Sequence, residues 1–385
     1  MELSHILNHL GEEHEKYFNA VAPPIIQTSN FYFNSVEEMK NSLENEFSEP
    51  VYSRGNNPTV AILRKKMAAL EGTEDALILA SGCAAISSSI IGNVKAGDHV
   101  ICINSPYGWT ASLLKNLLPR FGVETTFVDG TKVGNFVNEI RKNTAVIYLE
   151  SPNSFLFEMQ DLQAIAELAR TKSITTIIDN SYATPLHQKP AKLGIDLVLH
   201  TASKYLSGHS DVVSGVICGT SEMIRKIFAS EFMTLGGIIS PFDAWLMIRG
   251  LRTLSLRLEQ STRSALQVIG FLENQPLVER IFYPFHKSNL QLELAKKQMK
   301  AANGMFTVAF RATSKEKVVD FCNQFDVFKM AVSWGGHESL ISPVVAFPGS
   351  HDNTSLPWNL VRFYVGLDEP GLLIDDLKKA LRKLK

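Results

Sequence analysis

Short apolar segments alternate with segments of helical periodicity between residues 60 and 245. Each apolar segment is hydrophobic throughout rather than at alternate positions, and amphipathic stretches such as residues 111–118 and 162–170 lie between them. This pattern predicts an α/β fold, in which strands buried on both faces form a mostly parallel sheet between layers of helices. The predicted strands are residues 76–80, 100–104, 145–149, 175–179, 197–201 and 212–218.

The first 60 residues carry little periodicity of this kind. Pro23-Pro24 and Asn56-Asn57-Pro58 interrupt the segment, and only residues 35–44 predict a short helix. A segment of this length without a core of its own has to lie on another surface. We therefore expect residues 1–60 to form an N-terminal arm that contacts a neighbouring subunit.

A long helical pattern over residues 242–260 predicts a connector into a second, smaller region. We expect a large domain over residues 61–248 and a small C-terminal α/β domain over residues 249–385. The elements predicted in the small domain are strands at 305–310 and 361–365 and helices near 315–325 and 372–384.

The composition is that of an ordinary globular protein. The 385 residues include 38 basic and 39 acidic side chains, and the formal net charge of −1 argues against binding to nucleic acid or an anionic membrane. No apolar run is long enough to span a bilayer, and the acidic N-terminus does not resemble a signal peptide. The four cysteines lack the spacing of a metal site or a disulfide framework, so we expect a cytoplasmic protein without a metal.

Polar groups follow three of the predicted strands, at the edge where ligands bind in parallel sheets. Ser81-Gly82-Cys83 is a glycine turn that opens a helix and offers free amides to a phosphate. Asp179 ends its strand as a carboxylate that is costly to bury without a cationic partner. Lys204 follows a third strand, where a lysine must pair or lose its proton. Taken singly, each feature is more often structural: a turn, a helix cap or an ion pair.

Together these strand ends fit pyridoxal 5'-phosphate (PLP). A lysine with a lowered pKa forms a Schiff base with an aldehyde, a role that suits Lys204. Asp179 would face the ring nitrogen and keep it protonated, which makes the ring an electron sink. Thr201, Ser203 and the amides near Gly82 would hold the phosphate. Further residues that fit are Tyr107, for stacking on the ring, and Tyr52 and Arg54, for binding the phosphate.

These residues lie in motifs that resemble the Cys/Met-metabolism family of PLP enzymes. The family includes cystathionine β-lyase, cystathionine γ-lyase, cystathionine γ-synthase and methionine γ-lyase, and the resemblance extends from about Pro23 to the C-terminus. Its most specific motif surrounds Lys204 and is Leu199-His200-Thr201-Ala202-Ser203-Lys204-Tyr205-Leu206-Ser207-Gly208-His209-Ser210-Asp211. Supporting motifs are Pro24-Ile25-Ile26-Gln27-Thr28-Ser29, Tyr52-Ser53-Arg54, Ile178-Asp179-Asn180, Ser240-Pro241-Phe242-Asp243-Ala244, Arg249-Gly250-Leu251-Arg252-Thr253-Leu254, Ser333-Trp334-Gly335-Gly336 and Arg362-Phe363-Tyr364-Val365-Gly366.

The resemblance implies fold type I and a role for each matching residue in the cofactor site. Lys204 would hold the cofactor's aldehyde and act as the base, and Asp179 would be the partner of the pyridinium. Tyr107 would stack on the ring and transfer protons. The phosphate would be bound by Gly82, the Cys83 amide, Thr201 and Ser203.

The same resemblance implies a substrate site and an oligomer. Arg362 would clamp the α-carboxylate of a sulfur amino acid with the help of Ser333, and Asn180 would orient the site. Tyr52 and Arg54 would reach the phosphate of the neighbouring subunit. A site shared in this way implies a homodimer or a dimer of dimers.

The expected reaction is cleavage of a carbon–sulfur bond. Among the possible reactions, β-elimination of cystathionine to homocysteine, pyruvate and ammonia is favoured. The stretch 150–155 lacks the second proline of the family's Glu-Ser-Pro and Asn-Pro pattern, as do bacterial cystathionine β-lyases, which also share Ser333-Trp334-Gly335-Gly336. Against this choice, residues 81–85 look more like the γ-type enzymes.

At two positions this sequence differs from the family pattern in a way that is compatible with other sulfur substrates. Val332 stands where cystathionine γ-lyases and synthases tend to place an acid, which leaves room for methionine-like substrates. Trp109 is bulkier than the family's usual Gly or Cys and would narrow the pocket. The alternatives are therefore methionine γ-lyase, which gives 2-oxobutyrate, methanethiol and ammonia, and γ-replacement of the cystathionine γ-synthase or O-acylhomoserine sulfhydrylase type.

Two interpretations from other classes are less favoured. A protein that only stores or senses PLP has no need for the carboxylate clamp Arg362 or the proton donor Tyr107. A Rossmann-type dehydrogenase would carry a GxGxxG motif after one of its strands, and none follows any predicted strand.

Overall fold

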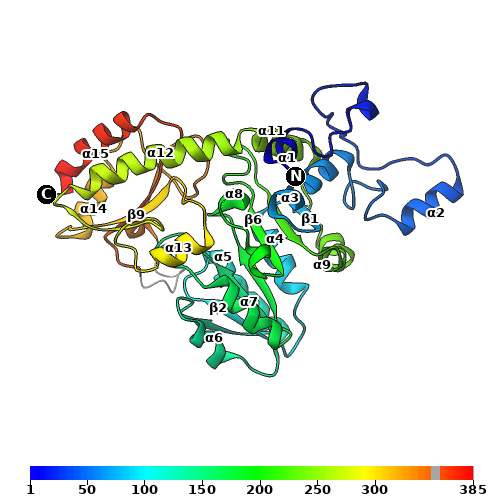
Figure 1. Ribbon diagram of the computed structural model, residues 1–385, viewed down its shortest axis with the longest axis horizontal. Coiled ribbons are helices and arrows are strands. Elements are labelled where there is room, and N and C mark those ends of the chain that lie inside the picture. The colour runs from blue at the N-terminus through cyan, green and yellow to red at the C-terminus, as the bar shows by residue number, and fades with distance from the viewer. Residues whose placement is uncertain (348–355, 385) are drawn as a thin grey trace.

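The computed structural model describes residues 1–347 and 356–384 (Figure 1). Its larger sheet has seven strands in the order β1-β7-β6-β5-β4-β2-β3. The strands β3, β2, β4, β5 and β6 run parallel, whereas β7 is antiparallel to both of its neighbours. Consecutive residues of β2 and β7 are all buried, which places the sheet between two layers. The strand bounds are β1 (Asp75–Leu79), β2 (His99–Ile103), β3 (Glu124–Val128), β4 (Thr144–Glu150), β5 (Thr175–Asp179), β6 (Leu197–Thr201) and β7 (Gly215–Gly219).

Each of the strands predicted in this region corresponds to one of these seven, and the predicted α/β sheet is confirmed. The sequence analysis missed β3, which lies at one edge of the sheet. Its sequence, Glu-Thr-Thr-Phe-Val, is polar over three of five positions, and most of the strand is only partly buried. A search for continuous apolar segments does not detect such an edge strand.

Helix α3, which precedes β1, begins and ends at residues that satisfy free backbone groups. Asn57 accepts a hydrogen bond from the Thr59 amide at the start of α3, and Gly72 ends that helix in the left-handed conformation. None of the described helices is both long and apolar enough to cross a membrane. Helix bounds in this part of the chain are α3 (Pro58–Glu71), α4 (Gly82–Ile91), α5 (Gly108–Ser112), α6 (Val133–Glu139), α7 (Leu162–Thr171), α8 (Thr184–His187), α9 (Ser221–Ile227), α10 (Met233–Leu235) and α11 (Pro241–Arg252).

A second sheet of five strands, in the order β10-β11-β12-β9-β8, forms the C-terminal part. The predicted helix over 242–260 is two helices, because the chain turns at Thr253 between α11 and α12. The predicted boundary between residues 248 and 249 falls inside α11, which packs against α3 of the first part. Bounds are β8 (Val278–Phe282), β9 (Met305–Phe310), β10 (Lys329–Met330), β11 (Leu340–Pro343), β12 (Leu360–Tyr364), α12 (Leu254–Glu273), α13 (Leu292–Gln298), α14 (Lys315–Cys322) and α15 (Pro370–Leu384).

The beginning of the chain packs on helices α3 and α11 of the same chain. Helix α1 (Leu3–Asn8) buries Ile6 and Leu7, and the Glu12 carboxylate lies 2.9 Å from both the Lys66 ammonium and the Arg252 guanidinium. The side chains of Glu12 and Lys66 are fully buried. We call Glu12, Lys66 and Arg252 the N-terminal latch.

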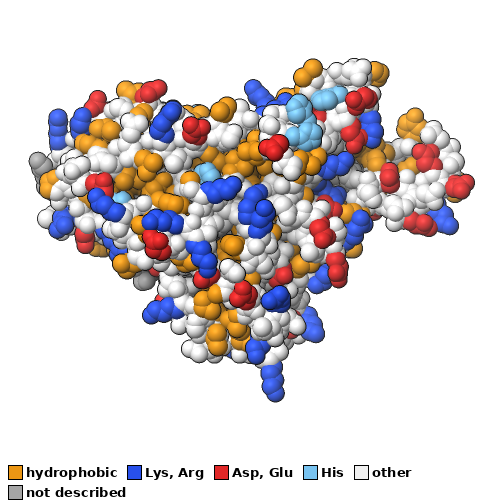
Figure 2. Space-filling model, in the orientation of Figure 1, with side chains coloured by type: hydrophobic (Ala, Val, Ile, Leu, Met, Phe, Trp, Pro, Cys, Tyr) orange, Lys and Arg blue, Asp and Glu red, His pale blue; other side chains and the backbone are white. Residues whose placement is uncertain are grey.

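The following segment does extend away from the body of the molecule. Helix α2 (Val36–Glu44) buries none of its residues, and Tyr32 and Val36 are 87% and 86% exposed. Figure 2 shows this protrusion with hydrophobic side chains at its surface. The capping of α2 by Ser35, whose hydroxyl accepts from the Glu38 amide, explains why the helix forms without a core.

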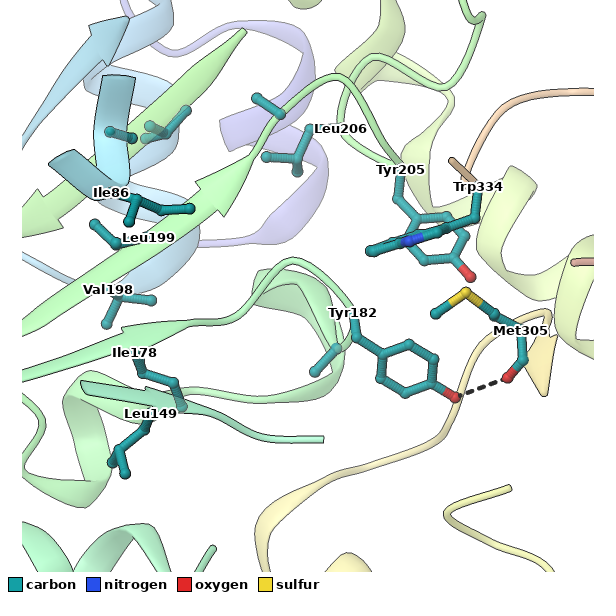
Figure 3. Close-up of a cluster of buried hydrophobic side chains, with 14 of the residues drawn as sticks. Ile86, Leu149, Ile178, Tyr182, Val198, Leu199, Tyr205, Leu206, Met305 and Trp334 are labelled. Atoms are coloured by element: carbon teal, nitrogen blue, oxygen red, sulfur yellow. Dashed lines mark hydrogen bonds between the residues drawn. The ribbon is translucent and has the colours of Figure 1, made fainter. Parts of the chain in front are cut away.

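A group of aromatic side chains joins the two sheets (Figure 3). Trp334 comes from the C-terminal part, and its ring lies 5.3 Å from that of Tyr205 and 6.4 Å from that of Tyr182. Tyr182 also donates a hydrogen bond to the backbone oxygen of Met305. Gly335 follows Trp334 with a φ of 90°, and a Cβ there would lie 2.6 Å from the Tyr205 nitrogen. These contacts fix the position of the neighbouring Ser333 relative to Lys204.

The N-terminal latch makes a prediction about stability. Glu12→Gln leaves the buried Lys66 ammonium without a counter-ion, and we expect the free energy of unfolding to fall by about 3 kcal/mol. Urea unfolding followed by circular dichroism measures the loss. An unchanged midpoint would mean that residues 1–12 are not docked in solution.

Candidate active site

A cleft of about 480 Å³ opens between the two sheets, at the carboxyl ends of the parallel strands. This is where parallel sheets bind ligands, since the strand ends and the loops after them carry free polar groups. The residues that the large sheet contributes include Glu150, Asp179, Ser181, Thr201 and Lys204, and those from the C-terminal part include Ser333, Trp334, Ser342 and Arg362.

Lys204 lies in the turn after β6, with its amine inside the cleft. Its Nζ donates a hydrogen bond to the Ser333 hydroxyl and lies 5.5 Å from the centre of the Trp334 ring. Burial, together with the positive charge of Arg362, lowers the pKa of the Lys204 amine to about 8, against the opposing effect of Asp179. The amine is therefore neutral above this pH and available as a nucleophile or base.

Asp179 ends β5 and lines the same cleft as a buried carboxylate. Its Oδ1 accepts hydrogen bonds from the Ser181 amide at 2.9 Å and the Ser181 hydroxyl at 2.5 Å. Burial raises the pKa of Asp179, whereas the bonds from Ser181 and the charges of His200 and Lys204 act in the opposite direction. A carboxylate in this setting is suited to a cationic ring nitrogen of a ligand.

The start of α4 and the end of β6 approach each other closely. A Cβ on Gly82 would lie 2.1 Å from the Thr201 hydroxyl, so only glycine fits at this position. The Ser81 hydroxyl caps the Ala84 amide, and no hydrogen bond to the Gly82 or Cys83 amide occurs among the described residues. Two amides without a partner at a helix N-terminus, with a hydroxyl beside them, are suited to binding an anion.

Tyr107 follows β2, and its amide donates to the Glu150 carboxylate at 2.7 Å. Burial is the main cause that raises the pKa of the Tyr107 phenol, with the neighbouring Cys83 thiol adding to it. The phenol consequently keeps its proton at neutral pH. Burial and the charge of Asp179 likewise raise the pKa of Glu150, which is paired with Asp179 in the register of β4 and β5.

Arg362, on β12, brings a buried cation to the opposite wall of the cleft. Its Nη1 and Nη2 donate long hydrogen bonds of 3.3 and 3.4 Å to the backbone oxygens of Ser154 and Ser333. The guanidinium also lies 4.6 Å from the centre of the Phe155 ring. No carboxylate forms an ion pair with Arg362 among the described residues, so its charge is available to an anionic ligand.

Several predicted site residues are not brought to this cleft. The Ser203 hydroxyl is bound to the backbone of Ser214, accepting from its amide at 2.9 Å. The substrate-binding role expected of Asn180 does not agree with its position, because the side chain is fully buried and donates to Glu71 and the Gln188 backbone. Tyr52 and Arg54 lie in the N-terminal segment and do not line the cleft of their own chain.

The cleft also contains residues that the sequence analysis did not assign to it. Ser181 fixes the Asp179 carboxylate, Trp334 packs over Lys204, and Phe155 lies against Arg362. Only the Asp-Asn-Ser order after β5 pointed to Ser181. Nothing in the sequence pairs Phe155 with Arg362, because more than two hundred residues separate them.

Comparisons with known proteins identify the family of this chain. Residues 5–382 match the family described as Cys/Met metabolism PLP-dependent enzyme. The chain is 37% identical over 375 residues to L-methionine gamma-lyase of Fusobacterium nucleatum subsp. nucleatum, covering 95% of each protein. It is 35% identical over 381 residues to cystathionine beta-lyase of Lactococcus lactis subsp. cremoris, covering 97% of each. The crystal structure of metB from Corynebacterium glutamicum superposes with a TM-score of 0.94 at 32% identity, covering 100% of this chain and 99% of that one.

The chain therefore belongs to the Cys/Met-metabolism family of PLP-dependent enzymes. This result confirms the family resemblance, the fold of type I and PLP as the cofactor. The residues present fit that group: the pKa of the Lys204 amine is lowered to about 8, Asp179 is a buried carboxylate, and the space beside Gly82 admits no side chain.

The Gly82 contact makes a prediction about cofactor binding. Gly82→Ala places a methyl group against Thr201, and we expect the affinity for PLP to fall at least about tenfold. Absorbance titration of the apoprotein measures it. Gly134→Ala in α6 is the control, since nothing lies within 4 Å of its Cβ. Equal affinities of the two variants would contradict an anion site at α4.

The lowered pKa of Lys204 makes a second prediction. Only the neutral amine reacts with an aldehyde, so the rate of PLP incorporation should rise with pH through about 8 and then level off. Arg362→Gln removes a positive charge that favours the neutral amine, and the midpoint should move to higher pH. Stopped-flow absorbance of the apoprotein provides the profile.

The control for this profile is Lys115→Gln, which removes an exposed cation from the same cleft. Lys115 is not among the charges that act on Lys204, so its midpoint should stay in place. If the Arg362 variant kept the original midpoint as well, the charge of Arg362 would not control the amine.

Proposed function

We propose that this protein is a carbon–sulfur lyase that cleaves thioether amino acids by elimination, with cystathionine as the main substrate and homocysteine, pyruvate and ammonia as products. The observation that carries the proposal is the shared cleft of Lys204, Asp179 and Arg362. A base with a lowered pKa, a partner for a ring nitrogen and a free cation for a carboxylate are the groups that such an elimination needs.

Each residue has a role that follows from its geometry. Arg362 binds the α-carboxylate in bidentate fashion, which holds Cα toward the Lys204 amine. Lys204, neutral near pH 8, accepts the Cα proton. PLP supplies the electron sink for the pair left behind. Tyr107 lines the cleft and keeps its proton because its pKa is raised, and its proposed role is to donate that proton to the departing sulfur.

Cystathionine is favoured by both the cleft and the sequence. The substrate carries a second amino-acid end, and Lys115 and Asn116 give the cleft polar groups that suit its distal carboxylate. The stretch 150–155 and Ser333-Trp334-Gly335-Gly336 share their pattern with bacterial cystathionine β-lyases.

Methionine γ-elimination is the second candidate. The described wall of the cleft carries Trp109, Phe155, Val332 and Phe347, which suit a small apolar group on sulfur. Relatives from several bacteria carry the name L-methionine gamma-lyase, at 36–38% identity. γ-Replacement of an activated homoserine ranks third.

The active form proposed here is a homodimer or a dimer of dimers in the cytoplasm. Tyr52 is 44% exposed and the Arg54 guanidinium lies 5.5 Å from its ring centre, in the segment that follows the exposed helix α2. Ser203 does not face the cleft of its own chain, so the phosphate has fewer protein ligands there than expected. Tyr52 and Arg54 of a neighbouring subunit would supply the missing ones.

The products identify the reaction. The PLP-loaded protein is incubated separately with L-cystathionine and L-methionine, and the 2-oxo acid is identified by chromatography. We expect pyruvate and homocysteine from cystathionine, and a loss of at least about a thousandfold in Lys204→Ala. Lys115→Gln should raise KM for cystathionine up to about fivefold and leave methionine unaffected.

Other outcomes would select other reactions. If 2-oxobutyrate and methanethiol from methionine were the only products, the protein would be a γ-lyase. If neither substrate yielded an oxo acid, the elimination would be wrong and γ-replacement would move to the front.

A further inference from the structure

A continuous chain of buried hydrogen bonds lies behind the strands that carry the site. Starting at β4, Gln188 Nε2 donates to the Ser151 backbone oxygen at 2.7 Å and to Asn180 Oδ1 at 3.0 Å. Asn180 Nδ2 in turn donates to Glu71 Oε1 at 3.1 Å. The same Glu71 oxygen lies 2.6 Å from His200 Nε2. We call Glu71, Asn180, Gln188 and His200 the rear clamp.

The members of the rear clamp are deeply buried, yet none of them lines the cleft. Their exposed fractions run from 0% to 2%. Because a carboxylate only accepts, His200 Nε2 must carry the proton in this contact. Burying an acid, a histidine and two amides is costly unless they are mutually bonded, so the clamp holds one specific arrangement.

The alternation of side chains along a strand explains the separation of the clamp from the cleft. Glu150 is in register with Asp179, and Asp179 is in register with Leu199, so these side chains share one face of the sheet. Thr201, two residues after Leu199, shares that face and lines the cleft. Asn180 and His200 occupy the positions between and therefore point to the opposite face.

The clamp consequently ties together three strand ends that each carry a group of the site. Ser151, the residue after Glu150, is held through its backbone oxygen. Asn180, the residue after Asp179, and His200, the residue before Thr201, are both held by their bonds to Glu71. Glu71 is the last residue of α3, so its side chain connects these strand ends to that helix.

We propose that the rear clamp sets the relative positions of Glu150, Asp179 and Thr201, and that Glu71 and His200 are positioning residues for the PLP site. They act without touching cofactor or substrate. The proposal rests on the cofactor and not on which carbon–sulfur bond is cleaved, so it can fail or succeed independently of the reaction proposed above.

The test compares variants by their affinity for PLP, measured by absorbance titration of each apoprotein. Glu71→Leu removes the acceptor for two buried donors, and we expect the dissociation constant to rise about tenfold or more. Glu71→Gln keeps an acceptor oxygen and should stay within about threefold of the original protein. If Glu71→Leu fails to fold, Gln188→Met, which removes the bonds to the Ser151 oxygen and to Asn180 Oδ1 but keeps those to Glu71, should show a smaller rise in the same direction.

Glu12→Gln in the N-terminal latch is the matched control. It breaks a buried ion pair of Lys66, which lies five residues before Glu71 on the same helix α3, and in the described part of the chain neither Glu12 nor Lys66 contacts a clamp residue through a hydrogen bond. Its affinity for PLP should be unchanged. An unchanged affinity in both Glu71→Leu and Gln188→Met would overturn the proposal, as would an equal loss in Glu12→Gln. Equal losses in Glu71→Gln and Glu71→Leu would overturn the positional account in favour of a direct effect of charge.

Discussion

Lys204 lies where two sheets meet, and its burial there holds the pKa of its amine near 8. An ordinary lysine is protonated at this pH and cannot act as a nucleophile or base. The neutral state depends on the walls of the cleft: Trp334 covers the amine from the C-terminal part, and Arg362 adds a repelling charge. The junction of the two sheets is therefore part of the chemistry, because a looser junction would admit water and restore the proton.

The parallel strands of the large sheet position the other polar groups of the cleft. Residues in register on neighbouring strands deliver Glu150 and Asp179 to the same face, and Thr201 joins them two positions after Leu199. The residues between them face the other way and form a buried polar group of their own. Because side chains alternate across a strand, adjacent positions in the chain supply the residues of the cleft on one face of the sheet and the hydrogen-bonded polar residues on the other face.

Local patterns in the sequence were sufficient to predict the sheet, and the motifs singled out Asp179, Lys204 and Arg362, which line one cleft. Continuous apolar segments identified the strands, and the motif around Lys204 identified the family and its cofactor. Contacts between distant segments were beyond such patterns: the pairing of Phe155 with Arg362 and the docking of Glu12 on Lys66 depend on tertiary packing. Asn180 was assigned to the substrate because it follows Asp179, but the strand alternation turns its side chain to the rear face.

The most direct test of the account is to find which lysine carries the cofactor. Sodium borohydride reduces the bond between PLP and the amine that holds it, and peptide mass spectrometry of the digested protein then locates the pyridoxyl group. The account predicts the label on the peptide that contains Lys204. A label on another lysine, or none on a protein that retains its visible absorbance, would contradict it.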